Sequence, residues 1–136
     1  MKTLFFLLLL GANFCAFSQL KNEHKIEAVY GSDWLELMRS SNPELLTLLD
    51  KYAEHGFTIQ ETSSGKYAEL NALNSIPLTS KTNEEISVEQ FIIELNSQDF
   101  NPLRYRFFPT NEYQVLKLEG VNKIIYILPQ EVILSK

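Results

Sequence analysis

The segment formed by residues 124–128 limits the possible folds more than any other part of the chain. It reads Ile-Ile-Tyr-Ile-Leu, so an extended strand would carry apolar side chains on both faces. Such a strand lies in the centre of a sheet, or has one face on helices and the other against a partner. Residues 113–118 precede it, turn residues 119–122 lie between, and Pro129 follows. We therefore predict a β-hairpin over residues 113–128.

A second hairpin is predicted nearer the N-terminus. Residues 57–62 alternate between apolar and polar, residues 63–66 supply turn-forming Ser, Ser, Gly and Lys, and residues 67–70 begin a return strand. The stretch that follows contains Pro77, which is tolerated at the edge of a sheet and not in its centre. We expect at most a short edge strand around residues 76–78.

The clearest helix signal starts at Asn42. Asn42 is a good capping residue, Pro43 suits the first helical position, Glu44 places an acid in the first turn, and Gly56 marks the end. Apolar residues recur at helical spacing between these signals, which predicts an inner face made of Leu45, Leu48, Leu49 and Tyr52.

Two more helices are indicated. Ser87 and Gln90 form a capping box that begins a helix ending near residues 96–99. Its expected inner face consists of Val88, Phe91, Ile92 and Leu95.

A further helix is predicted over residues 33–39 with Ser32 as its cap. Whether residues 26–30 extend it upstream through Gly31 stays open, because a glycine inside a helix costs about 1 kcal/mol without forbidding it.

Together these segments predict an α+β fold. An antiparallel sheet built from two β-hairpins would pack against two or three helices, in a single compact domain over residues 19–136. We find no repeat, linker or low-complexity tract that would divide this domain.

Residues 1–18 are interpreted as a secretory signal peptide. Lys2 precedes a short Leu- and Phe-rich run, and Ala16 and Ser18 provide the small residues expected before a cut. The alternative is lipidation at Cys15, but bulky Phe14 stands where a lipoprotein signal requires a small residue. If the cut follows Ser18, the mature chain has no cysteine and its core alone must hold the fold.

The mature chain is acidic. Without Lys2, 11 Lys and Arg residues oppose 17 Asp and Glu residues, a formal charge of −6. Such a surface repels phosphate backbones and anionic lipids, which argues against nucleic-acid binding. Beyond the leader, no apolar run is long enough to cross a membrane.

No catalytic, metal or cofactor motif is recognised. His24 and His55 lack metal-ligand spacing, there is no nucleophile elbow or phosphate-binding loop, and the adjacent acids Glu84 and Glu85 suit a helix N-terminus. We therefore expect neither an enzyme nor a bound metal or cofactor.

The best candidate binding surface is the segment of residues 99–109, which combines aromatic and arginine side chains between two prolines. These residue types are enriched at the centres of interfaces. The candidate surface residues are Phe100, Arg104, Tyr105, Arg106 and Phe108. The alternative is structural, with Leu103, Tyr105 and Phe107 alternating into the core and the arginines in water.

The C-terminal tail offers two alternatives as well. Val132, Ile133 and Leu134 either fold back onto the core or form an exposed edge for strand addition by another chain.

The leader, ending Ala16-Phe17-Ser18-Gln19 ahead of a cysteine-free acidic chain, resembles small exported proteins of Gram-negative bacteria of the Bacteroidota type. The resemblance implies a periplasmic or outer-membrane-associated location and transfers no functional residues.

Three functions follow as hypotheses. The first is a non-catalytic periplasmic interaction module, such as an accessory subunit of a cell-envelope or secretion complex, with a protein partner or a second copy of itself. The second is a small-ligand binder with a pocket between sheet and helices, using Trp34, Tyr52 and Tyr126. The third is a carboxylate-dependent hydrolase using Glu84 or Glu85.

Overall fold

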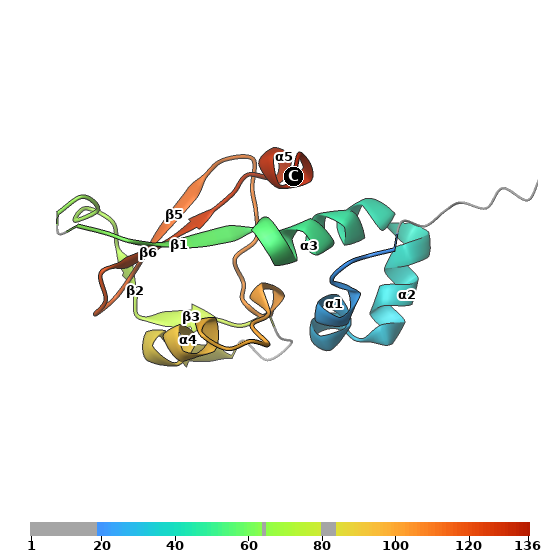
Figure 1. The fold of residues 1–136 in the computed structure, drawn as a ribbon, viewed down its shortest axis with the longest axis horizontal. Coiled ribbons are helices and arrows are strands. Elements are labelled where there is room, and N and C mark those ends of the chain that lie inside the picture. Colours follow the sequence, from blue (N-terminus) through green and yellow to red (C-terminus); the bar gives the residue numbers. More distant parts are fainter. Residues whose placement is uncertain (1–18, 64, 80–83) are drawn as a thin grey trace, which may run out of the picture.

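The computed structural model describes residues 19–63, 65–79 and 84–136. The predicted signal peptide, including Cys15, lies outside the described residues. The described chain is a single α+β domain of five helices, a mixed four-stranded sheet and a two-stranded hairpin sheet (Figure 1). The α+β class and the single domain agree with the prediction. The strand pairing does not, because the main sheet is mixed and is not built from two hairpins.

The predicted helix starts at Asn42 and Ser87 are confirmed by their capping contacts. The Leu45 amide donates to Asn42 Oδ1 at 3.2 Å, and the Gln90 amide donates to Ser87 Oγ at 3.1 Å. In the described residues the helices are α1 (Glu23–Tyr30), α2 (Ser32–Ser41), α3 (Pro43–His55), α4 (Val88–Leu95) and α5 (Gln130–Leu134), with a short 3₁₀ helix η1 (Pro102–Arg104).

Gly31 separates α1 from α2. Its φ of +87° lies in a region that glycine occupies at little cost, and the chain changes direction there. The question left open by the sequence is therefore decided in favour of two helices. The cap of α2 is Gly31 and not Ser32, which is the first helical residue.

The hairpin over residues 113–128 is confirmed, and its second strand is central. The four-stranded sheet has the order β1-β6-β5-β2, and Leu116 faces Ile125 within the hairpin. Its strands are β1 (Phe57–Glu61), β2 (Ala72–Leu73), β5 (Gln114–Leu118) and β6 (Lys123–Ile127). Strand β6 is paired along both edges, and Ile124 and Ile125, which point to opposite faces of the sheet, are both buried, which accounts for the apolar pattern.

The predicted first hairpin is wrong. Strand β1 pairs antiparallel with β6, with Ile59 opposite Ile125, and residues 67–70 form turns. Strand β2 pairs with β5 in parallel, so the sheet is mixed and not antiparallel. The physical reason is that β6 offers β1 a ladder of five residues, of which residues 124–127 are apolar, whereas the segment at residues 67–70 is only four residues long and contains Glu69.

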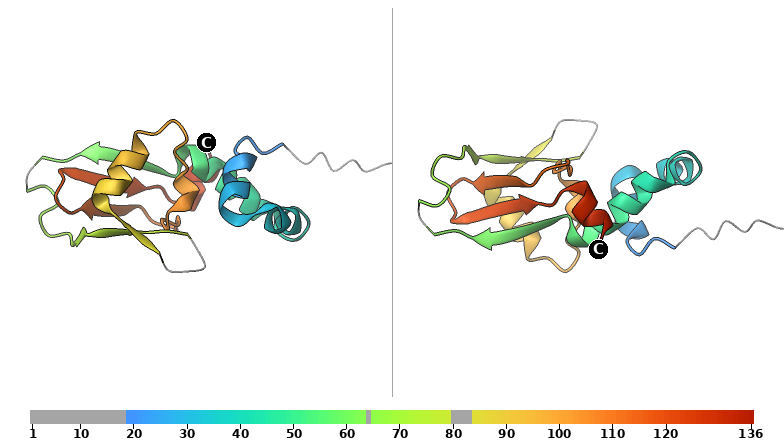
Figure 2. Two further views of the ribbon diagram at one scale, coloured as in Figure 1. Left: turned by 90° about the horizontal axis from the view of Figure 1, so that it is seen from below. Right: turned by 90° about the horizontal axis from the view of Figure 1, so that it is seen from above.

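The predicted edge strand near Pro77 exists but belongs to another sheet. Strand β3 (Ser75–Pro77) pairs antiparallel with β4 (Glu85–Ser87), and Ile76 faces Ile86. This small hairpin and α4 cover one face of the main sheet, while α1, α2 and α3 form a helical lobe at its end (Figures 1 and 2). The domain is therefore built from a helical lobe beside a layered sheet.

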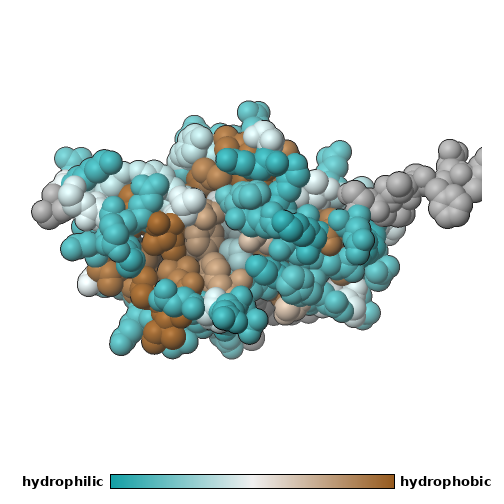
Figure 3. Space-filling model, viewed as in Figure 1, coloured by the Kyte–Doolittle hydropathy of each residue, from teal (hydrophilic) through white to brown (hydrophobic). Residues whose placement is uncertain are grey.

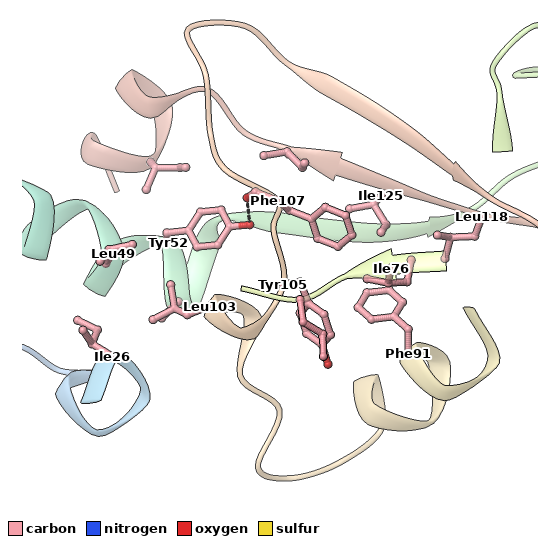
Figure 4. Packing of buried hydrophobic residues seen from close by; sticks show 14 of the residues in the cluster. Ile26, Leu49, Tyr52, Ile76, Phe91, Leu103, Tyr105, Phe107, Leu118 and Ile125 are labelled. Carbon is pink, nitrogen blue, oxygen red and sulfur yellow. Dashed lines mark hydrogen bonds between the residues drawn. The ribbon is translucent and has the colours of Figure 1, made fainter. Parts of the chain in front are cut away.

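The core lies where these layers meet, and most of its side chains are aliphatic; the buried aromatic members among the described residues are Tyr52, Phe91, Tyr105 and Phe107 (Figure 4). Phe91 of α4 packs edge-on against Tyr105, with ring centroids 4.8 Å apart. The predicted inner face of α4 is confirmed: Val88 and Phe91 are buried, and Ile92 and Leu95 pack against the core at half-buried positions.

The C-terminal tail folds back as the helix α5. Ile133 is fully buried, and Lys51 Nζ of α3 donates to the Leu134 carbonyl at 2.7 Å. The alternative of an exposed strand edge is wrong, because the segment is helical and uses its backbone groups internally. Hydrophilic residues cover most of the visible face, with apolar areas over α4 and α5, where Ile93 and Leu134 are exposed (Figure 3).

Among the described helices, none has the length and apolarity required to cross a membrane.

Candidate ligand-binding cavity

The segment of residues 99–109 does not present all of its candidate residues at the surface. Tyr105 is only 2 % exposed and Phe100 is half-buried, whereas Arg104, Arg106 and Phe108 are exposed. Leu103, Tyr105 and Phe107 point into the core, as the structural alternative expected. The segment is a 3₁₀ turn followed by extended chain, with one β-bridge between Leu78 and Tyr105.

Both arginines of this segment have partners in the fold. The Arg104 guanidinium pairs with Glu94 of α4 at 2.9 Å, and Arg106 Nε donates to the Leu78 carbonyl at 3.1 Å. The Tyr105 hydroxyl donates to the same Glu94 carboxylate. These contacts tie the segment to α4 on one side and to the β3 region on the other.

The Glu94 carboxylate binds both Arg104 and Tyr105 of this segment. Burial by itself would raise the pKa of its carboxyl, but hydrogen bonds from Tyr105 and Gln90 and the charge of Arg104 outweigh burial and lower it. The pKa of the Tyr105 hydroxyl is raised by burial and by the bond to Glu94. Tyr105 therefore stays neutral and donates to an ionised carboxylate.

A cavity of about 280 Å³ lies where this segment meets the helical lobe. Its wall combines residues from α1, α2, α3, η1, the following extended chain and α5. These are Tyr30, Trp34, Leu45, Leu48, Leu49, Tyr52, Leu103, Tyr105, Phe108, Pro109 and Gln130. In Figure 4, Leu49 and Tyr52 lie across from Leu103 and Tyr105.

The helix α3 contributes one whole side of the cavity. All four residues of its predicted inner face, Leu45, Leu48, Leu49 and Tyr52, line the cavity. Only Leu49 and Tyr52 of these are fully buried; Leu46 and Ala53, which the periodicity did not select, are buried as well. The inner face of α3 is thus apolar as predicted, and it borders the cavity instead of packing entirely against other side chains.

Tyr30 and Trp34 form the end wall. Their rings are stacked with centroids 4.4 Å apart, although Gly31 ends α1 between them. Burial raises the pKa of the Tyr30 hydroxyl, so the phenol stays neutral. Neither this hydroxyl nor the indole N–H of Trp34 makes a hydrogen bond to any residue that the structure describes.

The rest of the wall is held in place by hydrogen bonds. The Tyr52 hydroxyl donates to the Phe107 carbonyl, and burial raises its pKa far above the usual value for a phenol. At the other end, Gln130 Nε2 donates to the Pro109 carbonyl at 3.1 Å. The polar groups of Tyr52 and Gln130 are therefore engaged with the protein backbone.

The helix α1, which carries Tyr30, is fixed to α3 by a buried asparagine. The Asn22 amide donates to Asp50 Oδ1 at 2.6 Å, and Asn22 Nδ2 donates to the Asp50 carbonyl at 3.0 Å. From the other direction, Asn101 Nδ2 donates to the Lys25 carbonyl at 2.9 Å. The two asparagines hold the cavity's end wall against its sides.

The cavity unites residues from two separate hypotheses. The sequence predicts Trp34 and Tyr52 for a ligand pocket and Tyr105 and Phe108 for a binding surface, and all four line the same cavity. Tyr126 does not, because its hydroxyl shares a hydrogen bond with Tyr67 elsewhere on the sheet. Phe100, Arg104 and Arg106 do not line it either.

Sequence reasoning missed the other lining residues. Tyr30 lies in the segment whose structure was left open, and Leu103, Pro109 and Gln130 carry no local signal of a pocket. The apolar stripe of α3 was visible, but its periodicity does not distinguish a filled core from a cavity wall.

Other groups considered for chemistry are dispersed. Within residues 19–63, 65–79 and 84–136, no three His, Cys, Asp or Glu side chains are placed to hold a metal ion. His55 Nε2 lies 3.4 Å from Glu54, and Glu85 accepts a hydrogen bond from Ser75 Oγ at 2.7 Å.

Comparison of the chain with family models, with curated proteins and with solved structures found no significant match. The proposals below therefore rest on the residues and geometry of this chain alone.

Proposed function

We propose that this protein is an exported, non-catalytic binder of a small, largely apolar molecule, which occupies the cavity between α3 and residues 103–109. The observation that carries the proposal is a cavity of about 280 Å³ with a wall of aliphatic and aromatic side chains. Ligand pockets are concave and mostly apolar, and this cavity is near the lower end of their usual range of about 300–1,000 Å³.

The size and lining of the cavity support a small molecule. Since water takes about 30 Å³ per molecule in the liquid, the space corresponds to roughly nine water molecules. Water in an apolar cavity finds few hydrogen-bond partners, so an apolar ligand that replaces it gains free energy. Phe108, which is 51 % exposed, lies where such a ligand would meet solvent.

Fluorescence can test ligand binding without a label, since Trp34 is the only tryptophan of the chain and lines the cavity. The purified protein is titrated with N-phenyl-1-naphthylamine, an uncharged apolar dye, while the emissions of Trp34 and of the dye are followed. Binding is expected to quench Trp34 and to increase dye emission, with saturation at one dye per chain.

Two matched variants locate the dye. Leu48→Phe adds bulk to the cavity wall and is expected to weaken dye binding at least tenfold. Leu37→Phe makes the same change on α2 at a side chain that is 58 % exposed and outside the lining, and is expected to leave binding unchanged. Absence of saturable binding, or equal effects of the two substitutions, contradicts the proposal.

A second candidate is the non-catalytic interaction module in a cell-envelope or secretion complex. The observation that favours it is the exposure of Arg104 and Phe108 on one segment, with half of the Arg104 side chain open to solvent. Crosslinked affinity recovery from the native envelope, compared between the wild type and Arg104→Ala/Arg106→Ala, tests it. Neither arginine lines the cavity, so loss of a partner with retained dye binding would support this function separately.

The periplasmic or outer-membrane-associated location is also a proposal, supported by the leader ending at Ser18. Cell fractionation tests it: we expect the protein in the periplasmic or outer-membrane fraction with Gln19 as its N-terminus, and cytoplasmic protein that retains Met1 would contradict it.

A further inference from the structure

We infer that the cavity selects a planar, uncharged aromatic molecule that carries a hydrogen-bond acceptor. This inference rests on the proposed function and specifies its ligand. It combines three properties of the lining: its aromatic content, its lack of charge, and two hydrogen-bond donors that have no partner among the residues that the structure describes.

Aromatic rings make up a large part of the wall. Five of the eleven lining residues are aromatic: Tyr30, Trp34, Tyr52, Tyr105 and Phe108. Ring faces and edges prefer other aromatic rings in offset or edge-on arrangements, and they gain more from a planar ring than its apolar area alone would provide. Tyr30 and Trp34 already stack on each other, so a planar face is present at the end wall.

The lining carries no formal charge. None of its eleven residues is Asp, Glu, Lys, Arg or His. A charged ligand would lose its hydration without gaining an ionic partner, which is costly in apolar surroundings. The net charge of −5 for the whole chain opposes an anion further.

Two donors remain for a polar group on the ligand. The Tyr30 hydroxyl and the Trp34 N–H have no hydrogen-bond partner among the described residues, whereas Tyr52 and Gln130 are engaged. The indole N–H can only donate, and a phenol can donate. A carbonyl or ring nitrogen on a ligand that reaches these two groups would accept hydrogen bonds from them.

A matched set of bicyclic compounds tests the inference by calorimetry on the purified protein. The compounds are 2-naphthamide, its fully saturated analogue decahydro-2-naphthamide, the anion 2-naphthoate and the cation 2-naphthylmethylammonium. We expect 2-naphthamide to bind at least tenfold more tightly than each of the other three. Binding of the saturated amide or of either ion within threefold of 2-naphthamide overturns the inference.

Variants assign the preference to the end wall. Trp34→Leu keeps an apolar side chain and is expected to reduce the ratio of aromatic to saturated affinity to below three, while Leu37→Ala on the same helix leaves it unchanged. Nuclear Overhauser contacts between 2-naphthamide and the Trp34 ring in the wild type provide a readout that does not depend on the stability of a variant. Their absence in a saturated complex contradicts the assigned site.

The two proposals fail in different ways. If the naphthylamine dye binds in the cavity but the aromatic and saturated amides bind equally, or neither binds, the proposed function stands and the ligand class is wrong. If neither the dye nor any bicyclic compound binds, the proposed function fails as well.

Discussion

The ring of Tyr52 lies directly over Gly56, so that a Cβ built on the glycine would stand 2.1 Å from Tyr52 Cδ2. Gly56 has an ordinary right-handed backbone, with φ of −64° and ψ of −36°. Glycine is therefore required at this position for space and not for its conformational freedom. The contact positions the aromatic side chain that forms part of the cavity wall.

Gly56→Ala is expected to destabilise the protein by roughly 1–3 kcal/mol, because a buried ring must move to make room. Urea denaturation measures the change. In a Tyr52→Leu background the same substitution should cost much less, since the clash is removed, and the double-mutant cycle isolates the coupling. Equal costs in both backgrounds would show that Tyr52 is not the obstacle.

Tyr52→Phe removes only the hydroxyl that donates to the Phe107 carbonyl. The expected loss of stability is about 1–3 kcal/mol, because a buried acceptor loses its partner. Thermal or urea unfolding gives the value. Tyr113→Phe is the matched control, since Tyr113 is 61 % exposed, and should be close to neutral. A neutral Tyr52→Phe would contradict a role for this bond in holding the wall.

Glu94 should make stability depend on pH. Its pKa is lower in the folded protein than its ordinary value, so ionisation favours folding. The contribution is complete above the ordinary pKa of about 4.3 and is lost as the pH falls through the lowered folded value. We expect the stability difference between the wild type and Glu94→Gln to shrink as the pH falls below about 4.3.

Urea unfolding at a series of pH values checks this expectation. Tyr105→Phe removes one of the hydrogen bonds that lower the pKa of Glu94 and should weaken the same pH dependence. Glu89→Gln changes an exposed carboxylate on the same helix and is the control. A difference between the wild type and Glu94→Gln that stays constant with pH would rule out this linkage.

Asn42→Ala should lower stability by about 1 kcal/mol, because the Leu45 amide loses its capping acceptor at the start of α3. Asn42→Ser retains a capping oxygen and should cost only a few tenths of that amount. Chemical denaturation of the two variants decides between a lost cap and a general effect of substitution. Equal losses for alanine and serine would mean that the cap is not the cause.

Local signals predicted the elements whose stabilising contacts are local. Asn42 and Gly56 bound α3, Ser87 starts α4, and the hairpin β5–β6 forms where turn residues separate two apolar runs. Each of these depends on neighbours a few residues apart, which a sequence displays directly.

Pairings between distant segments escaped sequence reasoning. The sequence pattern predicts a hairpin between β1 and residues 67–70, but β1 pairs with β6, more than sixty residues away. The parallel strand β2 was not foreseen, and the apolar tail was not recognised as a helix. Each outcome depends on which partner offers the longer apolar ladder or the better-packed face. These are contacts between distant segments, which the pattern within a single segment does not reveal.

The sequence by itself determined an α+β chain with a central strand at residues 124–128, two well-capped helices and an apolar stripe on α3. Only the tertiary structure decided that this stripe faces Tyr30, Trp34 and Tyr105 across a cavity. The physical reason is that an apolar period records the preference of a face to avoid water, whereas the space left beside it depends on how closely other elements approach.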